Sequence, residues 1–285
     1  MSSPYVRLYS NHDVRRGCVS GAGRPQAGSR RLPRHEADAR HVDACARLLH
    51  PVREPRPRQW PCASLELDDL AAKLVSGGRG GYCYEHNLLF AAVLRELGYT
   101  VSLHSGRVLY GARGDAVRPR SHTMLLVHFD DEPQPYLTDV GFGTVGCLLA
   151  PIPLIADAEL RDEPRRHRLV RETGPNPLPT WTLQAHTDGE WVNQYMFTEE
   201  TFLPVDYQML NWYTSTFPRS PFKLAPFIQH NSPERHLELT GKTLTERHVD
   251  GTRAVREIED RAELIRLLRT EFGIDVPQYF VESAS

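Results

Sequence analysis

The spacing of apolar residues changes from a helical to an alternating period near residue 99, and this change restricts the fold more than any other feature. Before it, Leu89, Val93 and Leu97 recur at helical spacing, and Gly98 stands where a helix-terminating glycine is expected. After it, alternating stretches separated by turn residues predict strands at Arg107–Tyr110, Thr123–Phe129, Tyr136–Val140, Thr180–Ala185 and Trp191–Met196. Helices followed by strands favour an α+β fold over an alternating α/β fold.

Both flanks of this region also contain predictable elements. Apolar residues between Leu65 and Val75 can line one face of a helix that Gly77 ends. Near the C-terminus, three short strands are predicted at His236–Leu239, Leu244–His248 and Arg253–Ile258. A final helix follows a capping box formed by Asp260 and Glu263.

Composition excludes several classes of protein. The 285 residues are 40% hydrophobic and 25% charged, which is ordinary for a globular protein. We find no run of about 18 apolar residues and no secretory signal, so we expect neither a membrane span nor export. The five cysteines are scattered without a CxxC pair, which argues against a zinc ribbon or disulfide framework and fits a reducing cytoplasm.

Residues 1–63 differ from the rest of the chain. They contain twelve arginines, no lysine and five acidic residues, a net charge of +7, so the remainder carries −9. They also lack phenylalanine and isoleucine, and their apolar residues follow no period. A basic arm that binds nucleic acid is one interpretation of such asymmetry. The composition predicts a segment that forms a core poorly.

A cysteine follows two glycines at the expected start of the second helix, in the sequence RGGYCYEHN of residues 79–87. The unpaired N–H groups and the positive dipole end of a helix N-terminus favour a thiolate at Cys83. A buried, inert cysteine is the alternative, and it is the commoner fate of a free thiol.

A histidine and an aspartate lie in two of the predicted strands. Residues 119–127, PRSHTMLLV, place His122 at the start of an apolar strand, and residues 136–143, YLTDVGFG, place Asp139 within another. An aspartate is costly to bury without a partner, and a histidine ring is a suitable one. A core histidine and a turn-capping aspartate are the alternatives. Cysteine, histidine and acid together suit acyl transfer through a thiol.

These three segments resemble the arylamine N-acetyltransferase family, whose nucleophile motif is R-G-G-[FY]-C-[FY]-E-x-N and whose acid lies in D-V-G-F-G. The resemblance extends from about Ser64 to Pro277. It implies an N-terminal helical region over residues 1–98, an antiparallel β-barrel over 99–204 and a C-terminal α/β lid over 205–285. It also implies a papain-like site with Cys83 as nucleophile, His122 as base and Asp139 as orienting acid.

The same resemblance implies the reaction and its partners. Acetyl-CoA is the expected co-substrate, no metal is expected, and small aromatic amines or hydrazines are the expected acceptors, with no nucleic-acid or membrane partner. Ser215, Thr216 and Ser220 are assigned to cofactor binding. Phe142 and Tyr84 are assigned to the substrate pocket, with core packing as the alternative. Glu85 is expected to be structural, paired with an arginine of its own motif. An amide synthase fed by a carrier protein, a thiol hydrolase and an inactive product are the rival interpretations.

The N-terminal region departs from the family, which normally contains an I-P-F-E-N-L-D segment. Read one nucleotide forward, the codons allowed by residues 50–56, HPVREPR, permit all seven of those residues. In the same frame residues 32–39 permit Y-L-G-T-R-P-T-L. We therefore predict that residues 15–62 are a frameshifted translation and poorly ordered. Cys18, Cys45, Cys62 and the basic charge are then accidents of the shift, which weakens the nucleic-acid interpretation.

Overall fold

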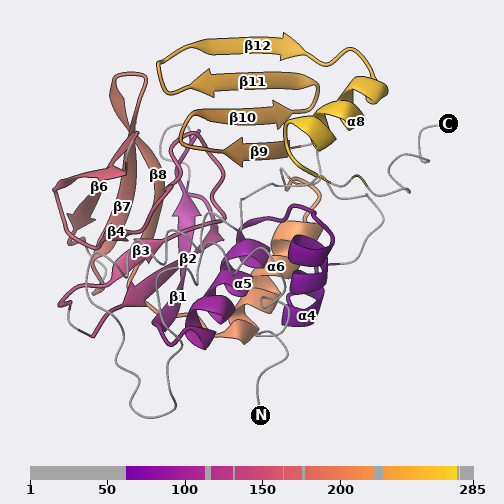
Figure 1. Ribbon diagram of the computed structural model, residues 1–285. Coiled ribbons are helices and arrows are strands. Elements are labelled where there is room, and N and C mark those ends of the chain that lie inside the picture. The colour runs from indigo at the N-terminus through magenta and orange to yellow at the C-terminus, as the bar shows by residue number, and fades with distance from the viewer. Residues whose placement is uncertain are drawn as a thin grey trace, which may run out of the picture.

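The computed structural model describes residues 62–112, 117–130, 132–162, 164–174, 177–220, 222, 227–274 and 276. It contains a helical part, a large curled sheet and a separate small sheet (Figure 1). The α+β class expected from the sequence is confirmed. The predicted frameshift at residues 15–62 lies outside the described residues apart from Cys62. The proposed domain limits at residues 98 and 204 remain a prediction.

Eight strands form the larger sheet, in the order β4-β3-β2-β1-β8-β7-β6-β5, and every neighbouring pair is antiparallel. The strands are β1 (Thr100–Val108), β2 (Arg120–His128), β3 (Tyr136–Thr138), β4 (Ile152–Pro153), β5 (Glu159–Asp162), β6 (Arg165–Glu172), β7 (Thr180–Thr187) and β8 (Glu190–Thr198). The two edge strands, β4 and β5, are only a few residues apart in the chain, so the sheet curls toward itself. This is the barrel-like middle predicted from the sequence.

Helices cover one side of this sheet. They are α4 (Leu67–Leu70), the π-helix η1 (Ala71–Ser76), α5 (Cys83–Glu96) and α6 (Pro204–Thr216). The buried side chains of Phe90 and Leu94 on α5 join Leu103 of β1 and Leu125 of β2 in one apolar core. Burial of this shared core fixes the start of α5 against the ends of the strands.

The C-terminal part is a second, four-stranded sheet with a helix packed on it. Its strands are β9 (Phe227–Asn231), β10 (Arg235–Thr240), β11 (Thr243–His248) and β12 (Arg253–Glu257), and the helix is α8 (Arg261–Thr270). Asp260 caps α8 by accepting a hydrogen bond from the Glu263 N–H at 2.8 Å, as the predicted capping box requires. Leu267 and Leu268 bury the inner face of α8 against this sheet.

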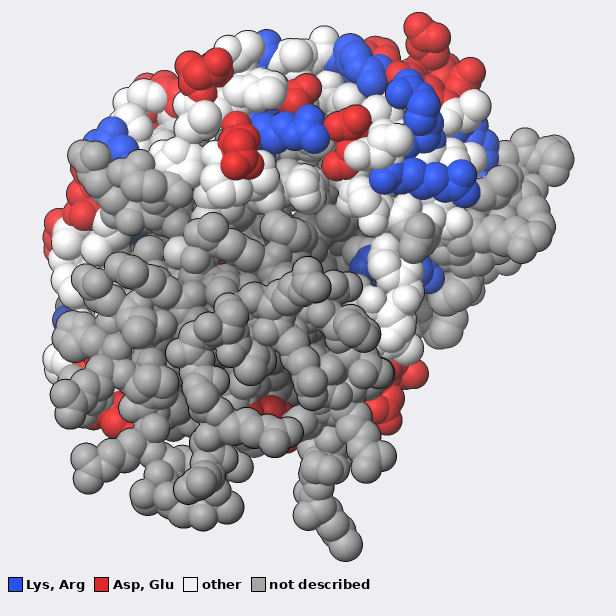
Figure 2. All heavy atoms as spheres, in the orientation of Figure 1, with Lys and Arg blue, Asp and Glu red and all other residues white. Residues whose placement is uncertain are grey.

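Acidic and basic side chains are intermixed over this C-terminal sheet (Figure 2). Several of them form ion pairs, such as Arg235 with Glu246 at 2.9 Å and Arg256 with Glu263. Surface pairs of this kind contribute little to stability, about 0–1 kcal/mol each.

Several elements differ from the sequence prediction. The first predicted helix is a four-residue α-helix that continues as the π-helix η1, and the strand predicted at Arg107–Tyr110 instead runs over Thr100–Val108 as β1. Helix α6 was not predicted, because it buries Asn211 and Thr214 while Met209 and Trp212 are exposed. Its apolar pattern is therefore inverted relative to an ordinary amphipathic helix. Strands β4, β5, β6 and β9 were also missed.

Candidate active site

Cys83 is the first residue of α5 and is buried at 2% exposure. The loop before it is fixed by side chains from the same helix. Glu85 accepts a hydrogen bond from the Tyr82 N–H at 3.2 Å, and His86 Nε2 accepts one from the Gly81 N–H at 3.1 Å. Glu85 also forms an ion pair with Lys73 of η1 at 2.9 Å. The structural role expected for Glu85 therefore involves a lysine from the preceding helix.

His122 and Asp139 form a buried hydrogen-bonded pair. His122 lies near the start of β2, Asp139 directly follows β3, and Nε2 of His122 is 2.6 Å from Oδ2 of Asp139. The Cys83 thiol donates a hydrogen bond to the Ser121 carbonyl at 3.7 Å, and Cys83 is near enough to His122 to contribute to its raised pKa. Because Nε2 is occupied by Asp139, Nδ1 is the ring nitrogen available to the thiol. The structure thus brings together the three residues that the sequence singled out.

The electrostatics of this pair favour its charged form. Burial lowers the pKa of His122, but the charge and hydrogen bond of Asp139, together with Cys83, outweigh burial and raise it to about 9. Burial raises the pKa of Asp139, but His122 and further hydrogen bonds outweigh burial and hold it below its ordinary value. At neutral pH the imidazolium form of His122 is therefore favoured.

Asn87 links the nucleophile helix to the acid, and sequence reasoning gave it no role. It lies one helical turn after Cys83 and is fully buried. Its Nδ2 donates to Asp139 Oδ1 at 2.9 Å and to the Thr123 carbonyl at 2.8 Å, while its Oδ1 accepts from the Val140 N–H at 3.1 Å. A polar residue one turn from the cysteine, on the same face of a helix, was the signal available in the sequence.

Gly141 allows the acid segment to approach the nucleophile. A Cβ atom at this position would lie 2.6 Å from the Cα of Cys83 and 2.8 Å from Nδ2 of Asn87. The Gly141 N–H also donates to Asp139 Oδ1 at 2.9 Å. The first glycine of the D-V-G-F-G segment is therefore required by close packing of backbone against backbone.

Two aromatic rings enclose the histidine. Phe142 and Tyr195 each have their ring centroid 4.9 Å from that of His122, and they lie 4.9 Å from each other. Burial and the nearby Asp139 carboxylate raise the pKa of the Tyr195 hydroxyl, which therefore stays protonated. Tyr195 lies in the middle of β8 between the buried Gln194 and the half-buried Met196, so no alternation marked it in the sequence.

A cavity of about 400 Å³ lies beside the acid segment and is lined by Asp139, Phe142, Gly143 and Cys147, among others. This volume lies within the range of small-molecule sites. Phe142 lines this cavity, and its assignment to the substrate pocket stays a prediction. Tyr84 is fully buried and packs at 5.4 Å against Tyr82 and at 5.9 Å against Tyr207, so its position favours the packing role.

The three residues assigned to cofactor binding lie at and after the end of α6. The Ser215 hydroxyl donates to the Asn211 carbonyl at 2.7 Å, and the Thr216 hydroxyl donates to the Trp212 carbonyl at 2.5 Å. Ser220 is buried at 5% exposure. None of the three lines the 400 Å³ cavity.

The described residues provide neither a metal centre nor a membrane-spanning helix. Within them, no group of three or more histidine, cysteine or acidic residues is arranged to hold a metal ion. No helix in this part of the chain has the length and apolar character needed to span a membrane.

The chain is similar to known transferases over most of its length. A family model described as N-acetyltransferase matches residues 60–281. An arylamine N-acetyltransferase of Mycolicibacterium smegmatis is 36% identical over 217 residues, which are 76% of this chain and 76% of that protein.

Solved structures give the same result. The crystal structure of Nocardia farcinica arylamine N-acetyltransferase superposes with a TM-score of 0.74 at 34% identity, over 86% of this chain and 83% of that one. The Mycobacterium marinum enzyme in complex with CoA superposes with a TM-score of 0.73 at 31% identity, over 85% and 89% of the two chains. On this sequence and fold similarity, the chain belongs to the arylamine N-acetyltransferase family.

Proposed function

We propose that this protein transfers an acetyl group from acetyl-CoA to the nitrogen of an arylamine or hydrazine through a thioester on Cys83. The observation that supports this most directly is the buried hydrogen-bonded pair of His122 and Asp139 near Cys83, which begins helix α5. The family membership and the CoA complex of the M. marinum relative support the choice of donor and acceptor.

The first half-reaction acylates the enzyme. The Cys83 thiolate attacks the thioester carbonyl, and a tetrahedral oxyanion forms. N–H groups of the first turn of α5, which have no partner within the helix, are placed to stabilise that oxyanion. The carbon–sulfur bond to CoA breaks, and the imidazolium of His122 gives its proton to the leaving CoA thiolate.

The second half-reaction transfers the acetyl group. The acceptor nitrogen attacks the acetyl carbonyl on Cys83 while neutral His122 takes a proton from that nitrogen. The carbon–sulfur bond to Cys83 then breaks and restores the thiolate–imidazolium pair. Asp139 holds the ring in the required orientation throughout, and Asn87 holds Asp139. We assign Phe142 to the acceptor pocket because it lines the cavity and packs on His122.

The test is to trap the acyl-enzyme. The protein is incubated with acetyl-CoA without an acceptor, and intact mass together with peptide mapping is expected to show one acetyl group on Cys83. Addition of an arylamine is expected to discharge it and yield the N-acetyl product. Cys83→Ala serves as the control and is expected to remain unmodified. Acetylation elsewhere, with turnover retained in the alanine variant, would exclude the proposal.

The same experiment separates the rival functions. A hydrolase releases acetate at the same rate with and without amine, whereas a transferase yields the amide. An amide synthase accepts an acyl group from a carrier protein and not from acetyl-CoA. An inactive protein forms no acyl-enzyme. We place the reaction in the cytoplasm, which the free thiols of Cys62, Cys83 and Cys147 support.

The frameshift remains a hypothesis about residues 15–62. The family match begins at residue 60, next to Ser64, where the original frame is predicted to have returned. Sequencing the gene across both junctions tests it. An intact reading frame there, shared by close homologues, would contradict the hypothesis, whereas gene repair that raises soluble yield and acetyl transfer would support it.

A further inference from the structure

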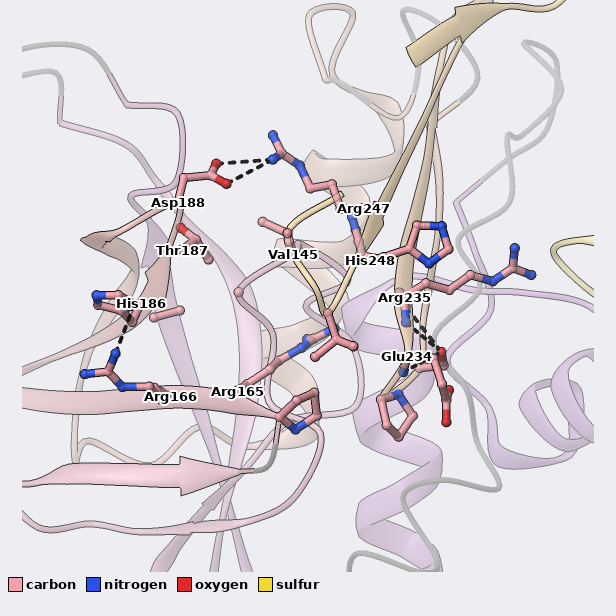
Figure 3. Close-up of a pocket in the computed structure, with 18 residues that line it drawn as sticks. Val145, Arg165, Arg166, His186, Thr187, Asp188, Glu234, Arg235, Arg247 and His248 are labelled. Atoms are coloured by element: carbon pink, nitrogen blue, oxygen red, sulfur yellow. Dashed lines mark hydrogen bonds and ion pairs between the residues drawn. The ribbon is translucent and has the colours of Figure 1, made fainter. Parts of the chain in front are cut away.

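A second, smaller hollow lies between the curled sheet and the C-terminal sheet (Figure 3). We call it the interdomain cleft. One wall comes from the start of β6 and the β7–β8 turn, and the other from β10, β11 and the loop after β9. Its volume is about 190 Å³, below the range of complete small-molecule sites, so it suits one group of a larger ligand.

The charge of the interdomain cleft is mainly positive. Four arginines line it, against two acidic residues, Asp188 and Glu234. Arg166 is paired with Glu159 at 2.8 Å, and Arg235 with Glu246 and Glu271 at 2.9 and 3.0 Å. These two guanidinium groups are therefore already neutralised by carboxylates outside the lining.

Arg165 differs from them because no carboxylate in the described part of the chain forms an ion pair with it. Its half-buried guanidinium donates to the Cys147 carbonyl at 2.7 Å, to the Cys147 sulfur at 2.8 Å and to Asn231 Oδ1 at 2.9 Å. Its positive charge, after burial, is the main cause that lowers the pKa of both His167 and His236. A partly buried cation without an anionic partner is costly, and an anion in the cleft would lower that cost.

Arg247 offers a second cation at the mouth of the interdomain cleft. It points across the mouth toward Asp188 on the β7–β8 turn (Figure 3), at 3.2 Å from Oδ2 and 3.4 Å from Oδ1. The Asp188 side chain is 78% exposed, so this pair is a weak one that a stronger anion can replace. Arginine suits phosphate because its planar fork donates two hydrogen bonds at once.

His236 supplies a hydrogen-bond acceptor in the interdomain cleft. Its Nε2 donates to the Gly143 carbonyl at 3.1 Å, which leaves Nδ1 unprotonated, and Nδ1 has no hydrogen-bond partner among the described residues. Burial and then Arg165 lower the pKa of His236 to about 3, so the ring is neutral at physiological pH. A hydroxyl group beside the bound anion can donate to it.

We propose that the interdomain cleft is a phosphate-binding subsite, with Arg165 at its inner end and Arg247 at its mouth. Given the proposed function, its expected occupant is a phosphate of the CoA thioester. The cleft and the 400 Å³ cavity share Ser232, Pro233 and Glu234, and that cavity reaches Asp139 and Phe142. The two hollows therefore adjoin at residues 232–234, and a donor that spans them lies beside the acid segment, away from Ser215 and Thr216. Neither Cys83 nor His122 lines either hollow.

The test uses three variants that each change the charge by one unit. Arg247→Gln removes a cation of the cleft, and Asp188→Asn removes the anion that competes with the ligand. Arg256→Gln is the matched control, because Arg256 lies on β12 of the same sheet and does not line the cleft. Thermal melting by circular dichroism is expected to give equal Tm values for all three, since their ion pairs are on the surface.

Inorganic pyrophosphate is the first probe, titrated into each protein by calorimetry. We expect Arg247→Gln to raise its Kd about tenfold, as loss of one charged hydrogen-bonding partner predicts, and Asp188→Asn to lower it about threefold. Arg256→Gln is expected to leave it unchanged. Absence of pyrophosphate binding, or equal effects of Arg247→Gln and Arg256→Gln, would overturn the proposal.

Steady-state kinetics then identify the occupant. Arg247→Gln is expected to raise the KM for acetyl-CoA about tenfold while leaving unchanged the KM for S-acetyl-N-acetylcysteamine, which has no phosphate. If pyrophosphate binding depends on Arg247 but the KM for acetyl-CoA does not, the subsite stands and serves a separate phosphate ligand. If neither thioester acetylates an amine, the proposed function fails, and the pyrophosphate titration still decides the proposal for the cleft.

Discussion

The thiol site and the interdomain cleft differ in how their polar groups are paired. Around Asp139, both carboxylate oxygens accept short hydrogen bonds from His122, Asn87 or Gly141, and the whole set is buried. In the interdomain cleft, the partners of Arg165 among the described side chains are neutral, and Arg247 is held by an exposed aspartate. In a site that must keep one geometry, the polar groups are all hydrogen-bonded to other groups of the protein. In a site that must receive a ligand, some charged groups lack an oppositely charged partner until the ligand binds.

Loss of the base should have the largest effect at the thiol site. We expect His122→Ala to lower kcat/KM about 10³-fold or more and to slow alkylation of Cys83 by iodoacetamide at neutral pH, because the imidazolium that stabilises the thiolate is gone. His128→Ala is the control on the same strand, where the side chain is exposed. If the two variants lose activity equally, His122 is not the base.

A side chain added at Gly141, where the acid segment contacts Cys83, should have the next largest effect on turnover. Gly141→Ala places a Cβ against the Cα of Cys83, so one of the two segments must move. Because small misplacements of reacting groups cost about 10²-fold, we expect kcat to fall by roughly that factor. Gly174→Ala is the control, since no atom lies within 4 Å of its added Cβ. Unchanged kcat in Gly141→Ala would show that the fit is looser than the structure indicates.

The buried pair of His122 and Asp139 should make the free energy of unfolding depend on pH. The pKa of His122 is raised on folding from 6.5 to about 9, so its contribution is complete below pH 6.5 and is lost as pH rises through 9. The free energy of unfolding should therefore fall by at most about 3 kcal/mol over that window. Urea unfolding at pH 6.5 and pH 9 measures this. The fall should be absent from His122→Ala, and its persistence there would assign it to other groups.

Loss of the hydrogen bond between Asn87 of α5 and Asp139 should have the smallest effect on turnover. Asn87→Ala leaves Asp139 without one donor, and the Thr123 carbonyl and the Val140 N–H without a partner. We expect kcat to fall about tenfold and stability to fall by about 1–3 kcal/mol. Asn193→Ala removes an exposed amide that is bonded to Gln184 and serves as the control. Equal kcat losses in the two would remove Asn87 from the site.

The features predicted from sequence are those encoded by local residue types. A cysteine after two glycines at a helix start, and a histidine and an aspartate in apolar strands, each break a local pattern, so they were visible before their contacts were known. Asp260 and Glu263 were likewise recognisable as a cap. His122 and Asp139 meet in the structure because the antiparallel pairing of β2 with β3 brings the start of β2 and the end of β3 to the same edge of the sheet.

The features missed depend on contacts between distant residues. Helix α6 was not recognised because its buried Asn211 bonds to the Ala63 carbonyl, 148 residues away, which overrides the usual apolar pattern. Arg165 belongs to the arginine-rich sequence of β6 and has no local signal. Only the packing of the two sheets places Arg165 in the lining of the interdomain cleft.

Helix α5 holds both Cys83 and Asn87, which bonds to the acid segment 52 residues later. The nucleophile and the support of the acid therefore reach their places in a single docking event. No partly folded state in which this helix is detached from the sheet can retain a working thiol site. Thermal inactivation should then coincide with the loss of protection of the α5 backbone amides against hydrogen exchange. It should precede or accompany the melting of the C-terminal sheet.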